Sequence, residues 1–250
     1  MDRSEPIPDH RAHYKEHGWV QIKRVLPIEV ADATLYKMQQ ELGGDWESYK
    51  GDYIKTFLTD KRAFECYSHD YSPMATLQYG LTPYISTLVG KDLLPTHCYF
   101  RVYRKGDICH VHSDAHACEH AMSLTLGYSN DYLWEFNISD KYFEADVGKP
   151  VEAAQRESHL GFHNLLLSVG DGVLYNGINY LHGRVKPNPN EWTAQIFLHW
   201  VDRAGKYAHH AFDGRTADLV KRAEFKFPEE GAPEKINPNR ADPVKERGHE

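Results

Sequence analysis

The stretch GDGVLYNGINYLHGRV, residues 170–185, decides the expected fold class. Its Gly-Asp-Gly start is typical of a turn that leads into a strand, and Asn176-Gly177 supplies a further turn. The next strand carries His182 and Arg184, which are two positions apart and are therefore expected on one face. Short strands joined by tight turns favour an antiparallel β-structure.

Similar short runs, rich in Tyr, Phe, Val, Leu and Ile and broken by Gly, Asn or Asp, recur from Leu94 onward. They do not alternate with helices, so a doubly wound parallel sheet is the poorer prediction. A succession of strands favours a sandwich or small barrel, and we expect an antiparallel β-roll. The predicted strands cover 97–104, 121–128, 132–138, 162–169, 172–176, 180–186 and 193–201.

The first part of the chain predicts a strand and two helices that back this sheet. Residues 18–22 alternate like a half-buried strand, and Pro27 can begin a helix that runs to about Leu42 before Gly43-Gly44. After Pro73, apolar residues recur at three- and four-residue steps up to Gly90. The predicted fold is therefore mainly β with flanking α-helices.

With 250 residues, 41% of them hydrophobic, the chain can form one domain with a sizeable core. We expect a single domain over 1–227, with a helical lead-in over 1–93, a β-roll core over 94–202 and a C-terminal segment over 203–227. Evenly spaced prolines among charged residues predict an extended tail over 228–250. The polar segment 139–160 is a candidate lid over an active site.

Composition excludes several partners. The formal charge is −7 and no long basic run is present, which disfavours a nucleic-acid partner. No apolar stretch approaches the roughly 20 residues of a membrane span, and the N-terminus lacks the apolar core of a signal peptide. We expect a cytoplasmic protein with no membrane partner. Its four cysteines show no CxxC spacing and are expected to be reduced thiols.

His112-Ser113-Asp114 is the candidate metal motif. Alternate residues of a strand share a face, so His112 and Asp114 can ligate one ion, and His182 can join them from another strand of a β-roll. Two imidazoles and one carboxylate form the facial triad of non-haem iron enzymes. An HxD motif alone is weak evidence, and a chance arrangement of structural histidines is the alternative.

The order of motifs over about residues 95–202 resembles the Fe(II)/2-oxoglutarate-dependent oxygenases, specifically their prolyl-hydroxylase-like branch. The motifs are the 99–107 segment, HxD, Gly-Asp-Gly, His-x-Arg and the 195–200 segment. The resemblance implies a double-stranded β-helix, or jelly-roll, core. It also implies Fe(II) on His112, Asp114 and His182, with 2-oxoglutarate and O2 as cosubstrates. The reaction implied is hydroxylation of an unactivated C–H bond, with release of succinate and CO2.

The carboxylate at Asp114 separates two reactions of this family. Related halogenases resemble the pattern but have a small residue at this position, which leaves room for chloride on iron. The presence of Asp114 therefore favours oxygenation, and its replacement by Gly is expected to remove hydroxylation.

The distal carboxylate of 2-oxoglutarate needs a cation, preferably a bidentate guanidinium in a partly dry pocket. In many members of the branch that cation follows the distal histidine by about nine to eleven residues, where this chain has Glu191, Trp192 and Thr193. Arg184 is the first substitute, because it shares the inward face with His182. Arg101 and Arg104 are the alternatives, with Arg104 and Lys105 expected in solvent.

Further pocket residues are predicted from position alone. Tyr103 matches a family tyrosine that hydrogen-bonds the cosubstrate, although a half-buried strand tyrosine is the alternative. For Glu119 and His120 there are two alternatives: their side chains contact a polar substrate, or they point into solvent. Trp134, Asn137 and Trp200 line the pocket or, for the aromatic residues, pack in the core.

The substrate is expected to be a small polar metabolite or an amino-acid-type molecule. Two other functions remain open. A cupin-like iron dioxygenase, in which the substrate itself chelates the metal, fits the missing downstream arginine. A catalytically silent β-barrel binding module would keep the histidines for metal-stabilised folding.

Overall fold

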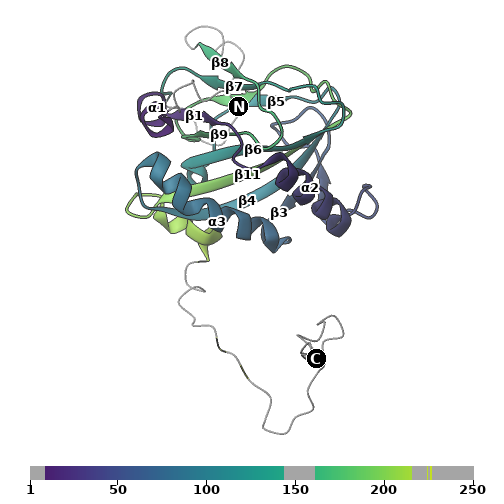
Figure 1. The fold of residues 1–250 in the computed structure, drawn as a ribbon, viewed down its shortest axis with the longest axis horizontal. Coiled ribbons are helices and arrows are strands. Elements are labelled where there is room, and N and C mark those ends of the chain that lie inside the picture. Colours follow the sequence, from purple (N-terminus) through teal and green to yellow (C-terminus); the bar gives the residue numbers. More distant parts are fainter. Residues whose placement is uncertain (1–8, 144–160, 216–223, 225, 227–250) are drawn as a thin grey trace, which may run out of the picture. The chain divides into compact units, whose positions relative to one another are not determined.

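The structure is a computed structural model that describes residues 9–143, 161–215, 224 and 226 of the chain (Figure 1). The chain divides into two units, 1–216 and 217–250, and all the helices and strands described here belong to the first. The predicted tail and most of the predicted lid lie outside the described residues. The predicted domain boundaries remain predictions.

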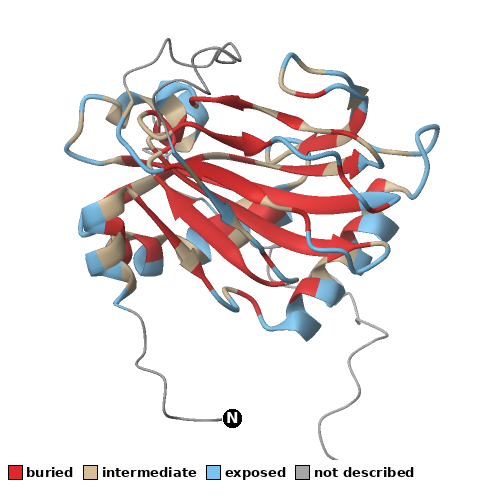
Figure 2. Ribbon diagram, turned by 90° about the horizontal axis from the view of Figure 1, so that it is seen from above, coloured by how far each residue is buried: buried red, intermediate tan, exposed pale blue. Residues whose placement is uncertain are grey.

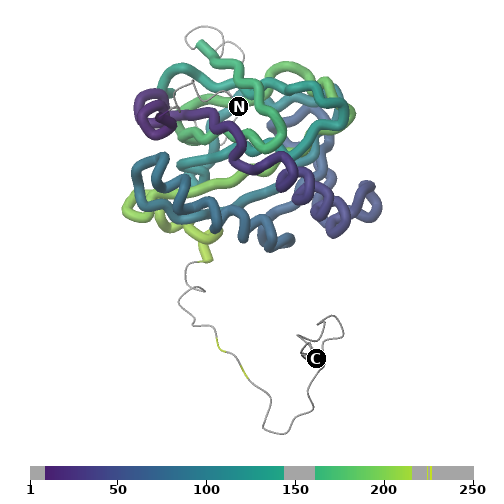
Figure 3. The backbone as a smooth tube through the Cα atoms, in the orientation of Figure 1, coloured from purple at the N-terminus to yellow at the C-terminus, as the bar shows by residue number. Residues whose placement is uncertain are grey.

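The first unit contains two antiparallel sheets. The seven-stranded sheet has the order β1-β9-β6-β11-β4-β3-β2, and the four-stranded sheet has the order β5-β10-β7-β8. Strands far apart in sequence, such as β6 and β11, lie side by side, as the tube in Figure 3 shows. The strands are β1 (Trp19–Ile22), β2 (Asp52–Ile54), β3 (Ala63–Tyr67), β4 (Leu93–Arg104), β5 (Cys109–His112), β6 (His120–Tyr128), β7 (Phe136–Ser139), β8 (Phe162–Leu165), β9 (Gly172–Tyr175), β10 (His182–Arg184) and β11 (Trp192–Asp202).

Helices α1 (His10–His17), α2 (Ile28–Leu42) and α3 (Ser72–Val89) contribute to the core of the seven-stranded sheet. The side chain of Asp9 caps α1 by accepting from the amide of Ala12. Gly90 ends α3 at a φ of 77°, a conformation that glycine adopts without steric cost. Two short 3₁₀ helices, η1 (His116–Cys118) and η2 (Ala208–Gly214), complete the fold.

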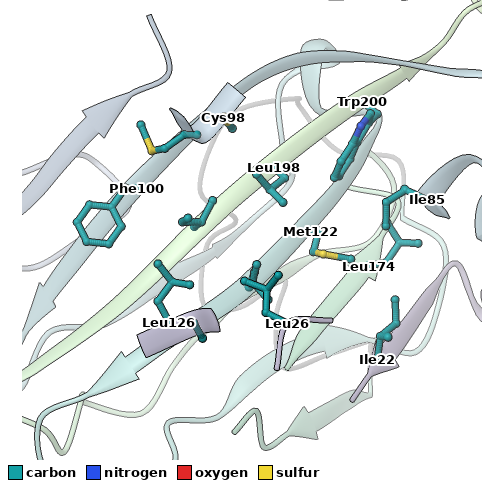
Figure 4. Packing of buried hydrophobic residues seen from close by; sticks show 14 of the residues in the cluster. Ile22, Leu26, Ile85, Cys98, Phe100, Met122, Leu126, Leu174, Leu198 and Trp200 are labelled. Carbon is teal, nitrogen blue, oxygen red and sulfur yellow. The ribbon is translucent and has the colours of Figure 1, made fainter. Parts of the chain in front are cut away.

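One face of the seven-stranded sheet forms the main core with the helices. A row of directly opposed residues crosses five strands: Val20, Leu174, Met122, Leu198 and Cys98. All five belong to one buried cluster, and Figure 4 shows the last four of them among its side chains. Burial of such a row fixes the register, because a slip by one residue would turn every side chain to the other face.

The alternate residues of the same strands point between the two sheets. On β11 these residues include Thr193, Gln195, Phe197 and His199, which are all buried. Figure 2 shows the central strands buried over most of their length, while the helices carry exposed residues on their outer sides. This sheet face is polar and aromatic in part, and it provides one wall of the candidate site.

The predicted fold class is confirmed: the chain is mainly β with flanking helices and an antiparallel two-sheet core. The helices ending at Leu42 and before Gly90 are also confirmed. The sequence reasoning missed α1, β2 and β3 as elements.

One predicted strand, 132–138, is wrong in its first half, because the strand begins only at Phe136. Asn190 holds the preceding loop: its Oδ1 accepts from the amide of Tyr132 and its Nδ2 donates to the carbonyl of Tyr132. Side chains thus satisfy the backbone groups that a strand partner would otherwise bind.

Candidate metal centre and reaction pocket

Three predicted ligands converge at one point between the sheets. His112 ends β5 and His182 begins β10, and the two residues are directly paired in the four-stranded sheet. The Nε2 atom of each imidazole lies 3.4 Å from Oδ1 of Asp114. One donor atom from each side chain fits within a span of 4.8 Å, so a single cation can contact all three.

Asp114 is positioned beside the two histidines in a different way from the predicted one. The strand ends at His112, so alternation along a strand does not place the carboxylate. Instead, the amide of Asp114 donates to the carbonyl of Gly177 at 2.8 Å, which fixes the turn after β5. Its Oδ2 is buried and has no hydrogen-bond partner among the described residues, as expected of a carboxylate prepared for a ligand.

Both imidazoles are oriented by backbone carbonyls. Nδ1 of His112 donates to the carbonyl of His110 at 2.7 Å, and Nδ1 of His182 donates to that of Tyr180 at 2.9 Å. A carbonyl only accepts, so in the neutral ring the proton is on Nδ1 and the lone pair of Nε2 faces Asp114. This is the outer support typical of metal-binding histidines.

The charges of the triad also favour a bound cation. Burial lowers the pKa of His112, and the neighbouring His182 lowers it further, so the ring stays a neutral donor. Burial opposes ionisation of Asp114, but His182 and His112 together hold the pKa of its carboxyl well below the usual range. The site thus offers a carboxylate between two imidazoles.

Gly177 is required beside the carboxylate. A Cβ at this position would lie 2.4 Å from Oδ2 of Asp114 and 2.5 Å from the carbonyl of Cys118. We expect Gly177→Ala to displace Asp114 and to weaken metal binding at least about tenfold. Metal titration by calorimetry checks this, with Gly80→Ala as the control because a Cβ there meets nothing within 4 Å. Unchanged affinity in Gly177→Ala would contradict the assigned close approach.

A pocket next to the triad contains Arg184 and Tyr103. Arg184 is 2% exposed, and its guanidinium lies over the rings of Trp134 and Phe136 at 4.9 and 5.5 Å. Nη1 donates to the carbonyl of Trp134, whereas Nη2 is buried with no partner among the described residues. A buried cation without a counter-charge is costly, so this pocket is suited to an anion.

Arg101 lines the same pocket but is already paired. Its Nε and Nη2 donate to Oε1 of the buried Glu65 at 2.7 and 2.6 Å, and its Nη1 donates to the hydroxyl of Tyr103 at 2.9 Å. Arg101 therefore positions Tyr103. Of the two buried arginines, Arg184 is the one with an unpartnered N–H group, on Nη2. It is also the arginine that the sequence favoured as the partner of the distal carboxylate. Arg104 is exposed, as predicted.

No protein-family model matches the chain, and no curated protein matches it in sequence. Among solved structures, the non-haem α-ketoglutarate-dependent carbocyclase SnoK from nogalamycin biosynthesis gives a TM-score of 0.63 at 13% identity, over 90% of this chain and 94% of that chain. The epimerase SnoN, in complex with Fe3+, α-ketoglutarate and nogalamycin RO, gives 0.59 at 12% identity over 89% and 90%. HygX from Streptomyces hygroscopicus, with nickel and 2-oxoglutarate bound, gives 0.55 at 12% identity over 80% and 89%.

The fold is that of the Fe(II)/2-oxoglutarate-dependent oxygenases. At these identities the comparisons concern the fold alone. They confirm the double-stranded β-helix core that the order of motifs predicted.

Two of the predicted substrate residues of this oxygenase fold lie outside the pocket of the triad. Glu119 accepts from the amide of Asp202 at 2.9 Å and lies 3.6 Å from Nζ of Lys91. His120 is buried, and its Nδ1 shares a hydrogen bond of 2.7 Å with the hydroxyl of Tyr14. In this arrangement both side chains stabilise the packing of the N-terminal helix and the end of β11.

His120 predicts a pH dependence of stability. Burial, with a smaller effect of Lys91, lowers the pKa of His120 to about 3 from 6.5. The folded state thus favours the neutral ring. The contribution of His120 to the free energy of unfolding is therefore complete above about pH 6.5, and it falls by about 1.4 kcal/mol for each pH unit below that value. Urea unfolding between about pH 6 and about pH 4 should show at least this slope, because burial also lowers the pKa of His199 to about 3, and His120→Gln should reduce it. An equal slope in that variant would assign the dependence to other groups.

Trp134 and Asn137 are placed by hydrogen bonds within the protein. Trp134 supports Arg184, and its Nε1 donates to the carbonyl of Lys186 at 2.7 Å. Nδ2 of Asn137 donates to Oδ1 of Asn164, and its own Oδ1 accepts from the amide of Val185. Neither residue lines the pocket, but both hydrogen-bond with the segment that carries Arg184. Trp200 packs in the main core.

The side chains that line the pocket without having been predicted as site residues include Tyr99, Tyr175 and His199. The ring of Tyr175 lies 4.4 Å from that of His182. Tyr99 was within reach of sequence reasoning, because it alternates with Arg101 and Tyr103 along one strand. Tyr175 lies within the Gly-Asp-Gly segment and His199 within the last quoted motif, but only the strand register places them at the metal centre.

The remaining site prediction, a lid over 139–160, falls mostly on residues 144–160, which lie outside the described part of the chain. No helix among the described residues is long and apolar enough to cross a membrane.

Proposed function

We propose that the chain is a non-haem Fe(II)/2-oxoglutarate-dependent oxygenase that hydroxylates an unactivated C–H bond of a small polar or amino-acid-type substrate. The observation that carries the proposal is the convergence of His112, Asp114 and His182 on one point. The fold similarity to oxygenases supports it. The reaction couples insertion of one oxygen atom of O2 into the substrate to conversion of 2-oxoglutarate to succinate and CO2.

The residues present fit Fe(II). His112 and His182 present Nε2 lone pairs, and Asp114 presents a carboxylate with an unpartnered buried oxygen. Two nitrogens and one oxygen are the donor set of the 2-His-1-carboxylate triad. Iron bound there supplies the activation of O2 for oxidation of the C–H bond. The chain supplies the orientation of the donors and a largely buried surrounding that excludes water.

The residues present also fit 2-oxoglutarate. Arg184 offers its free Nη2 to a carboxylate, and the aromatic rings of Trp134 and Phe136 lower the local polarity around the guanidinium. The hydroxyl of Tyr103, held by Arg101, is a second hydrogen-bonding group in the same pocket. We assign Arg184 and Tyr103 to the distal carboxylate of the cosubstrate, and Arg101 to the positioning of Tyr103.

The proposed substrate meets the pocket wall formed by Tyr99, Tyr175 and His199. Phenolic hydroxyl groups on aromatic rings bind polar molecules that also carry apolar surface. SnoN, which has a similar fold, was solved in complex with nogalamycin RO. A cytoplasmic location and the absence of nucleic-acid and membrane partners belong to the same proposal.

Anaerobic addition of 2-oxoglutarate to the Fe(II)-loaded protein tests the proposal. A weak visible charge-transfer band is expected, because the oxo acid then chelates the metal, and admission of O2 should release succinate. A missing band together with substrate-dependent O2 uptake would favour the cupin-like dioxygenase. Metal-dependent melting without O2 uptake would favour the silent binding module.

A further inference from the structure

A second cluster of metal-binding side chains lies beside the triad. It consists of His97 on β4, Cys118 on η1 and His199 on β11, and one donor atom from each falls within a span of 4.8 Å. Cys118 and His199 are buried, and His97 is half-buried. Nε2 of His97 lies 4.0 Å from the thiol sulfur of Cys118, and the two imidazole rings are 4.5 Å apart.

A β-bulge places the two histidines together. β4 and β11 pair at Cys98 with Leu198 and next at Pro95 with Trp200, so Thr96 and His97 oppose the single residue His199. Such a bulge redirects a side chain at a defined position. The hydroxyl of Thr96 donates to the carbonyl of Ala117 at 2.7 Å and fastens η1, with Cys118, against this bulge.

The side chain of Gln78, a residue of α3 that is only 1% exposed, holds the backbone of the bulge. Its Nε2 donates to the carbonyls of both His97 and His199, at 3.1 and 2.6 Å. Two hydrogens on one amide nitrogen allow both bonds. The positions of the two imidazoles are therefore set before any ligand binds.

His199 has the same outer support as the triad histidines. Its Nδ1 donates to the carbonyl of His97 at 3.0 Å, which leaves the Nε2 lone pair as the free donor. The thiol of Cys118 is not part of a disulfide. One sulfur and two imidazole nitrogens form a donor set for a thiophilic tetrahedral ion with one position left open.

We propose that His97, Cys118 and His199 bind a thiophilic divalent cation of the zinc class, at a site separate from the triad. Because His199 also lines the reaction pocket, an ion at this site forms part of the pocket wall. The binding reaction replaces the proton of the Cys118 thiol by the metal, and the proton goes to solvent. The inference does not depend on the proposed oxygenase activity.

Cobalt(II) tests the site, because thiolate coordination gives an intense near-ultraviolet charge-transfer band that the sulfur-free triad cannot produce. We expect the band in the wild-type protein and in His112→Ala/Asp114→Ala, where the triad is removed. Cys118→Ser should lose the band, and the matched control Cys66→Ser should keep it. His97→Gln, at a half-buried position, should weaken cobalt binding at least about tenfold.

The proposal would be overturned by the lack of a band in the wild-type protein with excess cobalt, by a band that survives Cys118→Ser, or by a band that is lost with the triad. Far-ultraviolet circular dichroism of each variant verifies that it is folded. In His112→Ala/Asp114→Ala, where the triad cannot take up the added metal, one equivalent of zinc should bleach the cobalt band, and failure of zinc to displace cobalt would also contradict the assignment. These readouts are independent of succinate formation, so a failure here is distinguishable from a failure of the proposed oxygenase function.

Discussion

Asp114→Asn is expected to lower kcat/KM for succinate formation by more than about a hundredfold, since even the outer support of a metal ligand is worth about ten- to a hundredfold. Asparagine keeps the shape of the side chain but removes the negative charge between His112 and His182. The two imidazoles alone would hold Fe(II) weakly. Asp114→Gly should have the same effect on hydroxylation. The measurement is the initial rate of succinate release over a range of 2-oxoglutarate concentrations, at an Fe(II) concentration that is just sufficient for the wild-type protein.

Asp60→Asn is the matched control, because Asp60 also contacts an imidazole, that of His110, at 3.0 Å but lies at the surface. It should leave the rate within about twofold. The rise in melting temperature on addition of Fe(II) gives a readout without turnover, and it should shrink in Asp114→Asn only. Wild-type succinate release by Asp114→Asn would refute the role of Asp114 as a ligand.

The strands of the core were predictable because their apolar residues have a period of two. Met122, Leu174 and Leu198 occupy one cross-strand row, and each lies in a run that the sequence marks as a strand. β2 and β3 were missed because Asp52–Ile54 is short and largely exposed, and because Glu65 interrupts the apolar pattern of β3. Glu65 is buried only because Arg101 pairs with it, and single-strand periodicity cannot show such a partner.

The metal triad was predictable as a set, but not the reason for its geometry. HxD and a distant histidine indicate the ligands, whereas the contact between the amide of Asp114 and the carbonyl of Gly177 depends on the tertiary fold. Likewise, the sequence ranks Arg184 above Arg101 only by its position two residues after His182. Only the buried Glu65, which neutralises one of them, distinguishes the two in space.

The cluster of His97, Cys118 and His199 shows the same limit more strongly. His97 and His199 are far apart in sequence, and their proximity follows from the bulge between β4 and β11. Cys118 joins them through a short 3₁₀ helix that no periodicity predicts. Residues that meet across strands are therefore the part of a site that sequence patterns identify least well.

Arg184→Gln is expected to raise the KM for 2-oxoglutarate about 30- to 1,000-fold, because a charge-assisted pair in a dry pocket contributes about 2–4 kcal/mol. Glutamine keeps a hydrogen-bond donor but removes the positive charge over Trp134 and Phe136. Fe(II) affinity should change little, since Arg184 is not a metal donor. Arg184→Lys should be intermediate, because an ammonium lacks the bidentate geometry of a guanidinium.

The sharpest readout is the preference between 2-oxoglutarate and a 2-oxo acid that lacks the distal carboxylate, such as 2-oxobutyrate. The wild-type protein should discriminate strongly, and Arg184→Gln should lose most of that discrimination because the charged partner of the distal carboxylate is gone. Arg104→Gln is the control, since Arg104 is exposed and contacts only the hydroxyl of Tyr53 among the described side chains. If Arg184→Gln kept the preference while Arg101→Gln lost it in a folded protein, the carboxylate would belong to Arg101, and its pairing with Glu65 would have to open when the cosubstrate binds.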